Sequence, residues 1–152
     1  MFAGTGTALI TPFGKDGSID EEALRRLVDF QGSNGVDVLL ACGSTGESAT
    51  MCHEEHLRTI EIVRDQAKKA KVLAGAGSNC TREAVELSKG AQDIGADGIL
   101  SISPYYVKPT QEGIYQHYSA IADAVDIPIV VYNIPGRTGS NITSDTMMRL
   151  AE

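Results

Sequence analysis

The sequence contains no tryptophan, few cysteines and no excess of positive charge. Its three cysteines, an odd number without CxxC spacing, indicate free thiols in a reducing compartment rather than a disulfide framework. The formal net charge of −7 disfavours nucleic acid and anionic membranes as partners. No apolar run approaches the roughly 18 residues of a membrane span, and residues 1–4 lack the charge that begins a signal peptide. We therefore expect a cytoplasmic protein that binds neither nucleic acid nor membrane.

Apolar segments with strand character alternate with segments of helical period along the chain. Predicted strands cover residues 5–10, 36–42, 72–74, 98–101 and 127–132. Predicted helices cover residues 18–31, 53–70, 81–94 and 110–125, and a last one begins at residue 144. Ser18 and Glu21 have the spacing of a capping box at the first helix, and Asn79 or Thr81 is the expected cap of the third. The alternation and the short connections predict five βα units and a parallel sheet.

A parallel sheet of this kind is either doubly wound or closed into a barrel. Residues 75–80 lack the third glycine of the dinucleotide-binding fingerprint, which disfavours a Rossmann-type dehydrogenase. Polar residues also follow every predicted strand, instead of gathering at one switch point. Both features favour a (β/α)8 TIM barrel, which needs about 250 residues. Five units are too few to close one, so we expect residues 1–152 to form the N-terminal part of a single TIM-barrel catalytic domain.

Polar groups that could do chemistry follow three of the predicted strands. In Gly43–Glu47, glycine-flanked hydroxyls and free amides suit a carboxylate, although a turn that caps the next helix is an equal alternative. Tyr105 and Tyr106 could transfer protons or plug the barrel mouth with aromatic rings. Tyr132 ends an apolar run shortly before Arg137, which either binds a carboxylate with two hydrogen bonds or forms a surface salt bridge. These residues share one edge of a parallel sheet, where active sites lie.

The histidines and cysteines give no metal or nucleophile signature. His53 and His56 do not form HExxH, and a zinc site would need further ligands that the sequence does not offer. A solvent-exposed helix face is the simplest interpretation of this pair, and we expect His117 to be an exposed helical residue as well. No cysteine has a partner histidine at a strand end, so a thiol nucleophile is not expected.

Three motifs in order resemble the dihydrodipicolinate synthase family, within the N-acetylneuraminate lyase group of class I aldolases. They are Gly43–Thr50, Pro104–Tyr106 and Tyr132–Thr138. The first motif is similar throughout the aldolase group, whereas Arg137 is more specific because sialic-acid lyases lack an arginine there. The resemblance spans the whole chain and implies neither a cofactor nor a metal.

The resemblance implies condensation of pyruvate with L-aspartate 4-semialdehyde through a lysine Schiff base. The product would be 4-hydroxy-tetrahydrodipicolinate, in lysine and diaminopimelate biosynthesis. Ser44, Tyr132 and Tyr106 would form a proton relay, with Ser44 standing where the family often has threonine. Thr45 would bind the pyruvate carboxylate, and Arg137 the semialdehyde carboxylate. The family's Schiff-base lysine lies at the end of a sixth strand, beyond residue 152, and no lysine present matches its position.

The resemblance also implies regulation and assembly. In the family, the counterpart of Tyr106 reaches into the site of a neighbouring subunit, which implies a homodimer or homotetramer. An allosteric site for L-lysine would lie at the dimer interface. The positions that match this site are Ser48, Ala49, His53, His56, Asn79, Glu83 and Tyr105. For the two histidines, an effector site is therefore as plausible as a plain helix face.

Two other functions remain compatible with the sequence. One is a sibling activity, such as a 2-keto-3-deoxy sugar acid aldolase or a related pyruvate-dependent lyase, from which Arg137 would distinguish the leading hypothesis. The other is a non-catalytic metabolite-binding barrel fragment, which would keep the binding groups without the nucleophilic lysine.

Overall fold

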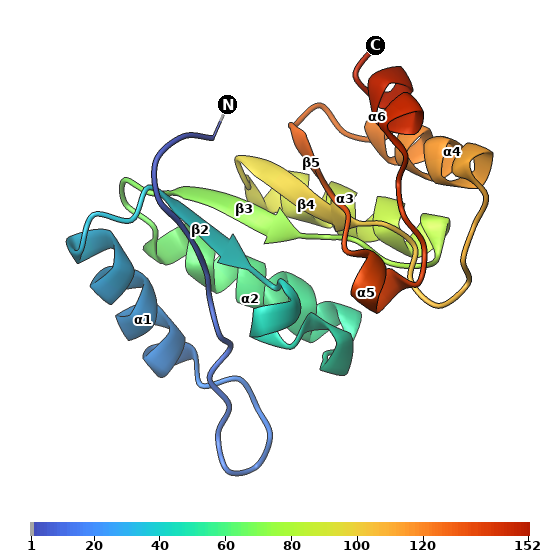
Figure 1. The fold of residues 1–152 in the computed structure, drawn as a ribbon. Helices are drawn as coiled ribbons and strands as arrows, with labels where there is room; N and C mark the ends of the chain where they lie inside the picture. Colours follow the sequence, from blue (N-terminus) through green and yellow to red (C-terminus); the bar gives the residue numbers. More distant parts are fainter. Residues whose placement is uncertain (1) are drawn as a thin grey trace.

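The computed structural model describes residues 2–152 and contains a five-stranded parallel sheet (Figure 1). The strand order is β1-β2-β3-β4-β5, so every neighbouring pair is joined by a helical crossover. The strands are β1 Gly6–Ala8, β2 Val38–Ala41, β3 Lys71–Gly75, β4 Gly98–Ile102 and β5 Ile129–Tyr132. All five lie where the apolar runs predicted them, and the sequential order is that of a (β/α)8 barrel.

Helices follow each strand. The longer ones are α1 Glu21–Ser33, α2 His53–Gln66, α3 Thr81–Ile94, α4 Gln111–Ala122 and α6 Ser144–Leu150. The structure also contains three short elements: the 3-10 turns η1 Ser44–Gly46 and η2 Ser48–Thr50, and the one-turn helix α5 Pro135–Thr138. A turn at Gly43–Glu47 was one of the two alternatives drawn from the sequence, but it does not cap α2, whose N-cap is Cys52; η2 and α5 were not predicted. All three short elements lie in connections that follow the carboxyl end of a strand. No helix in residues 2–152 is long and apolar enough to cross a membrane.

Several predicted helix ends were wrong. Asp20, not Ser18, caps α1, and its carboxylate accepts a hydrogen bond from the Ala23 amide at 2.9 Å. The Ser18 hydroxyl instead donates to Asp16. Helix α2 ends at Gln66, since the backbone of Ala67 is already extended. The N-cap position of α3 is held by Cys80, whose amide donates to the Ser78 hydroxyl at 3.0 Å.

One face of the sheet packs against the helices. Side chains alternate across a strand, and Leu39, Val72, Ala74 and Ile99 are fully or almost fully buried in a core shared with α2, α3 and α4. The opposite face is only half-buried. Its apolar side chains are Leu40, Leu73, Leu100 and Val130. The strand register pairs Leu40 with Leu73 and Leu100 with Val130. In a closed barrel this second face would be the interior.

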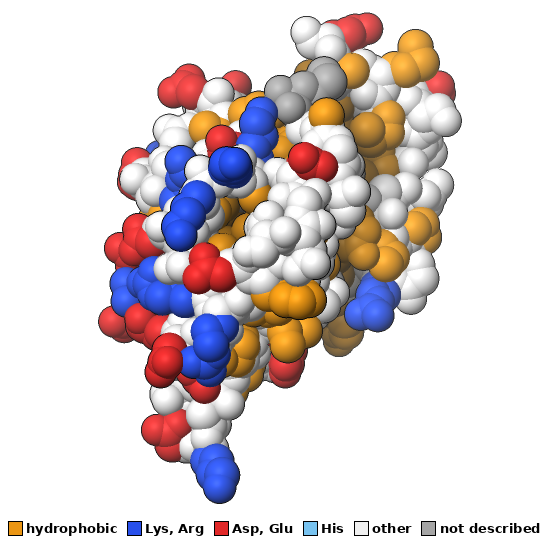
Figure 2. Space-filling model, turned by 90° about the vertical axis from the view of Figure 1, so that its left-hand side faces the viewer, with side chains coloured by type: hydrophobic (Ala, Val, Ile, Leu, Met, Phe, Trp, Pro, Cys, Tyr) orange, Lys and Arg blue, Asp and Glu red, His pale blue; other side chains and the backbone are white. Residues whose placement is uncertain are grey.

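Charged side chains cover the outer surface around α1 and α2. Basic and acidic groups are interspersed on the side of the molecule that carries α1 (Figure 2). Arg58 of α2 forms two hydrogen bonds with Glu21 of α1, at 2.8 and 2.7 Å, and Arg25 lies 3.7 Å from Asp65. Exposed pairs of this kind contribute about 0–1 kcal/mol each. They link α1 to α2 but supply little of the stability of the fold.

Candidate active site

The connection after β2 begins with a sharply bent segment, Gly43–Glu47, which we call the hydroxyl loop. Left-handed backbone conformations flank its single 3-10 turn, with φ of 54° at Cys42 and 59° at Glu47. Because such angles are unfavourable for residues with a Cβ atom, the surrounding contacts must hold this path. The turn leaves Ser44 and Thr45 exposed at the carboxyl edge of the sheet.

Two glycines bring the strand ends close together. A Cβ atom on Gly75, the last residue of β3, would lie 2.1 Å from the carbonyl oxygen of Cys42. A Cβ atom on Gly77 would lie 2.3 Å from the amide nitrogen of Ile102, which ends β4. Real Cβ atoms do not approach this closely, so only glycine allows the path found here. The connections that follow β2, β3 and β4 therefore converge.

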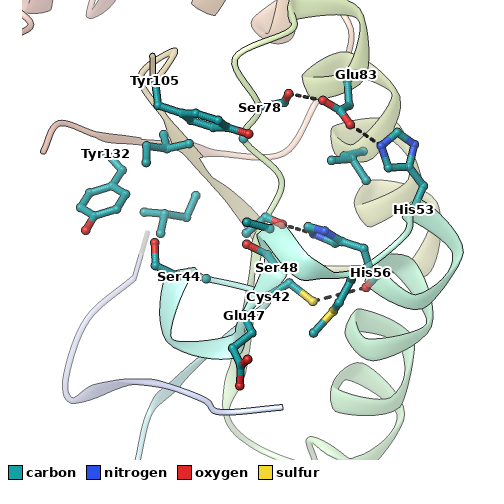
Figure 3. Close-up of a pocket in the computed structure, with 18 of the residues that line it drawn as sticks. Cys42, Ser44, Glu47, Ser48, His53, His56, Ser78, Glu83, Tyr105 and Tyr132 are labelled. Atoms are coloured by element: carbon teal, nitrogen blue, oxygen red, sulfur yellow. Dashed lines mark hydrogen bonds and ion pairs between the residues drawn. The ribbon is translucent and has the colours of Figure 1, made fainter. Parts of the chain in front are cut away.

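These connections surround a cavity of about 400 Å³ at the carboxyl edge of the sheet. Nine of the twelve residues proposed from the sequence line it: Ser44, Ser48, Ala49, His53, His56, Glu83, Tyr105, Tyr132 and Arg137. Figure 3 shows Ser44 and Tyr132 at one side of the cavity, and Glu83 with His53 at the other. Thr45, Asn79 and Tyr106 are not among the lining residues. The cavity thus has a hydroxyl half and a carboxylate half.

In the hydroxyl half, β5 and the short helix α5 deliver a phenol and a guanidinium. Tyr132 is the last residue of β5, and Pro135 starts α5 with a backbone angle that suits a first helical residue. Arg137 lies within this one-turn helix and is exposed. The following residue, Thr138, is buried, and its carbonyl accepts a hydrogen bond from the Tyr106 amide at 3.2 Å. This backbone hydrogen bond therefore connects the Pro104–Tyr106 motif with the Tyr132–Thr138 motif.

The three residues of the proposed relay are not hydrogen-bonded to one another within residues 2–152. Ser44 and Tyr132 share the cavity, but Tyr106 is 86% exposed. Its backbone φ of 71° is left-handed. The phenol of Tyr106 therefore belongs to the outer surface of its own chain rather than to its own cavity.

In the carboxylate half, Glu83 of α3 is the central group. It is paired with His53 of α2 and accepts a hydrogen bond from the Ser78 hydroxyl (Figure 3). These hydrogen bonds, that from Ser78 above all, lower the pKa of Glu83 and favour its charged form. Ser78 is buried and was not among the residues proposed from the sequence. Its position in the glycine-rich segment after β3 is the signal that could have found it.

The prediction of a solvent-exposed histidine pair was half wrong. His53 is exposed, but His56 is only 5% exposed, and its Nε2 lies 2.6 Å from the carbonyl oxygen of Gly75. Burial lowers the pKa of His56.

Cys42 donates from Sγ to the His56 carbonyl at 3.4 Å, and burial raises the pKa of this thiol to about 12. A thiol with so high a pKa is a poor nucleophile at neutral pH.

His117 was also predicted wrongly, because it is buried between α4 and α3. It is 3% exposed, its Nδ1 lies 2.9 Å from the Thr81 hydroxyl, and burial lowers its pKa. The spacing of His117 from Ile114, Tyr118 and Ile121 places it on the inward face of α4, but its polarity suggested the outer face. In residues 2–152, no three His, Cys, Asp or Glu side chains are grouped so as to hold a metal ion.

Sequential parallel βα units, with a cavity that holds polar side chains at the carboxyl ends of the strands, define a protein of the α/β-barrel class. Comparison with known sequences then identifies the family. The sequence profile described as "Dihydrodipicolinate synthetase family" matches residues 1–152, so the chain belongs to this family. The resemblance found in the three motifs is thereby confirmed.

Individual relatives agree with this assignment. The 4-hydroxy-tetrahydrodipicolinate synthase of Chloroherpeton thalassium is 59% identical over 151 residues, which are 99% of this chain and 50% of the relative. The crystal structure of the chloride-inhibited dihydrodipicolinate synthase from Acinetobacter baumannii, complexed with pyruvate, is 49% identical with a TM-score of 0.96, over 98% of this chain and 52% of that one. The crystal structure of the dihydrodipicolinate synthase from Cyanidioschyzon merolae with lysine bound is 44% identical with a TM-score of 0.94. The match covers 97% of this chain and 51% of that one. The chain spans about half the length of the relatives it matches.

Proposed function

We propose that the protein expressed from its complete gene condenses pyruvate with L-aspartate 4-semialdehyde through a lysine Schiff base. The product is 4-hydroxy-tetrahydrodipicolinate, in lysine and diaminopimelate biosynthesis. The observation that carries the proposal is that Ser44, Tyr132 and Arg137, from two strand ends far apart in sequence, line one cavity. The family membership and the names of the relatives support it.

Each group has a role that its chemistry suits. The amides of Ser44 and Thr45 have no hydrogen-bond acceptor within residues 2–152, and with the Thr45 hydroxyl they would hold the pyruvate carboxylate. Arg137 would bind the semialdehyde carboxylate with two parallel hydrogen bonds. Ser44 and Tyr132 would accept the methyl proton of the Schiff base, which becomes an enamine nucleophile, and pass it on. A phenol shares this charge with a neighbouring hydroxyl more easily than it carries the charge alone.

The relay would be completed by Tyr106 of a neighbouring copy. Its exposure and its left-handed backbone suit a side chain directed away from its own subunit. We therefore propose a homodimer or homotetramer in the cytoplasm. Residues 1–152 would be the N-terminal part of one TIM-barrel catalytic domain, and the half-buried face of Leu40 and Leu73 would line the barrel interior. The family's Schiff-base lysine would stand at the end of the sixth strand.

Steady-state assays of the protein expressed from its complete gene test this function. We expect product formation that requires both pyruvate and the semialdehyde. Since general acid–base catalysis contributes about 10²–10⁴-fold, Tyr132→Phe and Ser44→Ala should lower kcat by at least about 100-fold. If both variants kept the wild-type rate, the relay would be excluded. If the wild type did not consume both substrates, the function itself would be wrong.

A second proposal concerns the carboxylate half of the cavity, which we infer is an effector site for L-lysine. The ionised Glu83 suits an ammonium group. Asn79 donates to the carbonyl of the lining residue Tyr105 at 3.2 Å, and its amide would offer a polar partner to an amino-acid carboxylate. Ser48, Ala49, His53 and His56 would complete the site. The test is inhibition by millimolar L-lysine, which Glu83→Gln should weaken. An enzyme whose rate L-lysine left unchanged would exclude the effector site.

A further inference from the structure

The hydroxyl loop is attached to the rest of the fold by Thr11, a residue that does not line the cavity. The Thr11 hydroxyl donates to the carbonyl oxygen of Gly46 at 2.7 Å, across 35 positions of sequence. Thr11 is only 4% exposed and belongs to the connection that follows β1. This hydrogen bond is therefore shielded from water and joins the carboxyl ends of two neighbouring strands.

No other hydrogen bond within residues 2–152 links the hydroxyl loop to a segment outside the β2–α2 connection. The remaining bonds are local: Gly46 donates to Gly43 at 3.0 Å, Glu47 to Ser44 at 3.3 Å and Ser48 to Gly43 at 3.5 Å. The Thr50 amide and hydroxyl also donate to the Glu47 carbonyl. The local bonds close the turn, but they do not fix where it lies relative to the cavity.

The contact between Thr11 and Gly46 is tight as well as polar. A Cβ atom on Gly46 would lie 3.0 Å from the Leu9 carbonyl oxygen and 3.2 Å from the Thr11 hydroxyl. The loop also has left-handed residues on both sides, Cys42 and Glu47, so it needs external contacts to hold its path. The Thr11 hydroxyl donates to the carbonyl of Gly46, which directly follows Thr45 in sequence. The amide of Thr45 has no acceptor within residues 2–152 and is one of the groups proposed to bind the pyruvate carboxylate.

We propose that Thr11 is a positioning residue for the proposed pyruvate site. It acts through the Gly46 carbonyl and holds the amides of Ser44 and Thr45 where they meet a carboxylate. This inference rests on the proposed function and adds to it a residue without substrate contact. Removing the hydroxyl leaves the Gly46 carbonyl buried without its partner, and the turn can then rotate away from the cavity.

The test compares Thr11→Val, which keeps the shape but loses the hydroxyl, with Thr11→Ser, which keeps the hydroxyl. The protein is expressed from its complete gene, and KM is measured for each substrate. A hydrogen bond of ordinary strength corresponds to a rise of about 3- to 10-fold in the pyruvate KM of Thr11→Val. The semialdehyde KM should stay within about twofold, and Thr11→Ser should restore the pyruvate KM.

Thr146→Val is a matched control. Thr146 is 3% exposed, and its hydroxyl donates to Gln111 at 2.7 Å across the same 35 positions, but between α6 and α4. A purely structural role for Thr11 would lower the melting temperature of both valine variants and leave both pyruvate KM values alone. That result would overturn the proposal.

If Thr11→Val does not fold, Thr11→Ala and Thr11→Ser form the deciding pair, because they are similar in size and differ in the hydroxyl. A higher pyruvate KM in the alanine variant alone supports the proposal, and equal values overturn it. A wild type that forms no pyruvate adduct would contradict the proposed function and this inference with it, whereas an active wild type with an unaffected Thr11→Val contradicts the inference alone.

Discussion

Gly75 and Cys42 are in backbone contact, because a Cβ atom on Gly75 would lie only 2.1 Å from the Cys42 carbonyl oxygen. The contact brings the end of β3 against the end of β2, immediately before the hydroxyl loop. The Gly75 carbonyl is also the partner of the buried His56 ring, at 2.6 Å. Gly75 therefore contacts both the start of the hydroxyl loop, through Cys42, and the buried ring of His56.

Gly75→Ala should be strongly destabilising, because its added methyl group collides with backbone rather than with a flexible side chain. Overpacking of this kind costs about 1–3 kcal/mol, and here we expect the upper part of that range. Thermal or urea unfolding measures the loss. Gly32→Ala is the control, since it lies in α1 with no atom within 4 Å of the added Cβ and should be neutral or stabilising. Equal stability of the two variants would contradict the close approach.

Arg137→Ala should separate the two substrates. Since a charge-assisted hydrogen bond contributes about 1.5–3 kcal/mol, the semialdehyde KM should rise by about 10- to 100-fold. The pyruvate adduct should still form, because the hydroxyl loop is unchanged. Arg149→Ala is the control, since Arg149 pairs with Glu112 and lies over the Tyr115 ring, away from the cavity. An Arg137→Ala enzyme with unchanged semialdehyde kinetics would favour a sibling aldolase activity.

The two buried histidines should make the protein less stable in mild acid. Burial lowers the pKa of His56 and of His117 below the ordinary value of 6.5. Below about pH 6.5 the unfolded chain therefore binds protons that the folded chain does not, so the free energy of unfolding falls as the pH falls. Melting temperatures between pH 7.5 and 5 measure this. His117→Gln should flatten the slope, and an unchanged slope would contradict the burial of His117.

The three cysteines should differ in alkylation. Cys52 and Cys80 are exposed, whereas Cys42 is buried with a pKa raised to about 12 by that burial. Iodoacetamide at pH 8 should label Cys52 and Cys80 in the native protein, and Cys42 only after unfolding. Peptide mapping by mass spectrometry distinguishes the sites. Rapid native labelling of Cys42 would show that the contact between Cys42 and His56 opens readily.

The sequence predicted the elements that have enough residues to show a period. The apolar period of α3 gave its bounds, Thr81–Ile94, without error, and all five strands were located. The turn at Ser48–Thr50 and helix α5 were not predicted, because three or four residues contain about one turn and therefore no repeat. The site residues came mostly from recognisable motifs at strand ends, and nine of the twelve line the cavity.

Contacts between distant segments could not be predicted from the sequence. His56 looks like a surface residue beside His53, and only the packing of α2 onto β3 buries it against Gly75. The bond from Thr11 to Gly46 likewise depends on the register of β1 and β2, which no local pattern contains.

The most direct test of the central claim is the mass of the protein expressed from its complete gene, before and after incubation with pyruvate and borohydride. Borohydride reduces a Schiff base to a stable amine, so the account predicts a gain of one reduced pyruvate per chain, on a lysine, and no gain without pyruvate. A protein of intact fold that gains no pyruvate would contradict the account and leave the non-catalytic metabolite-binding role in its place.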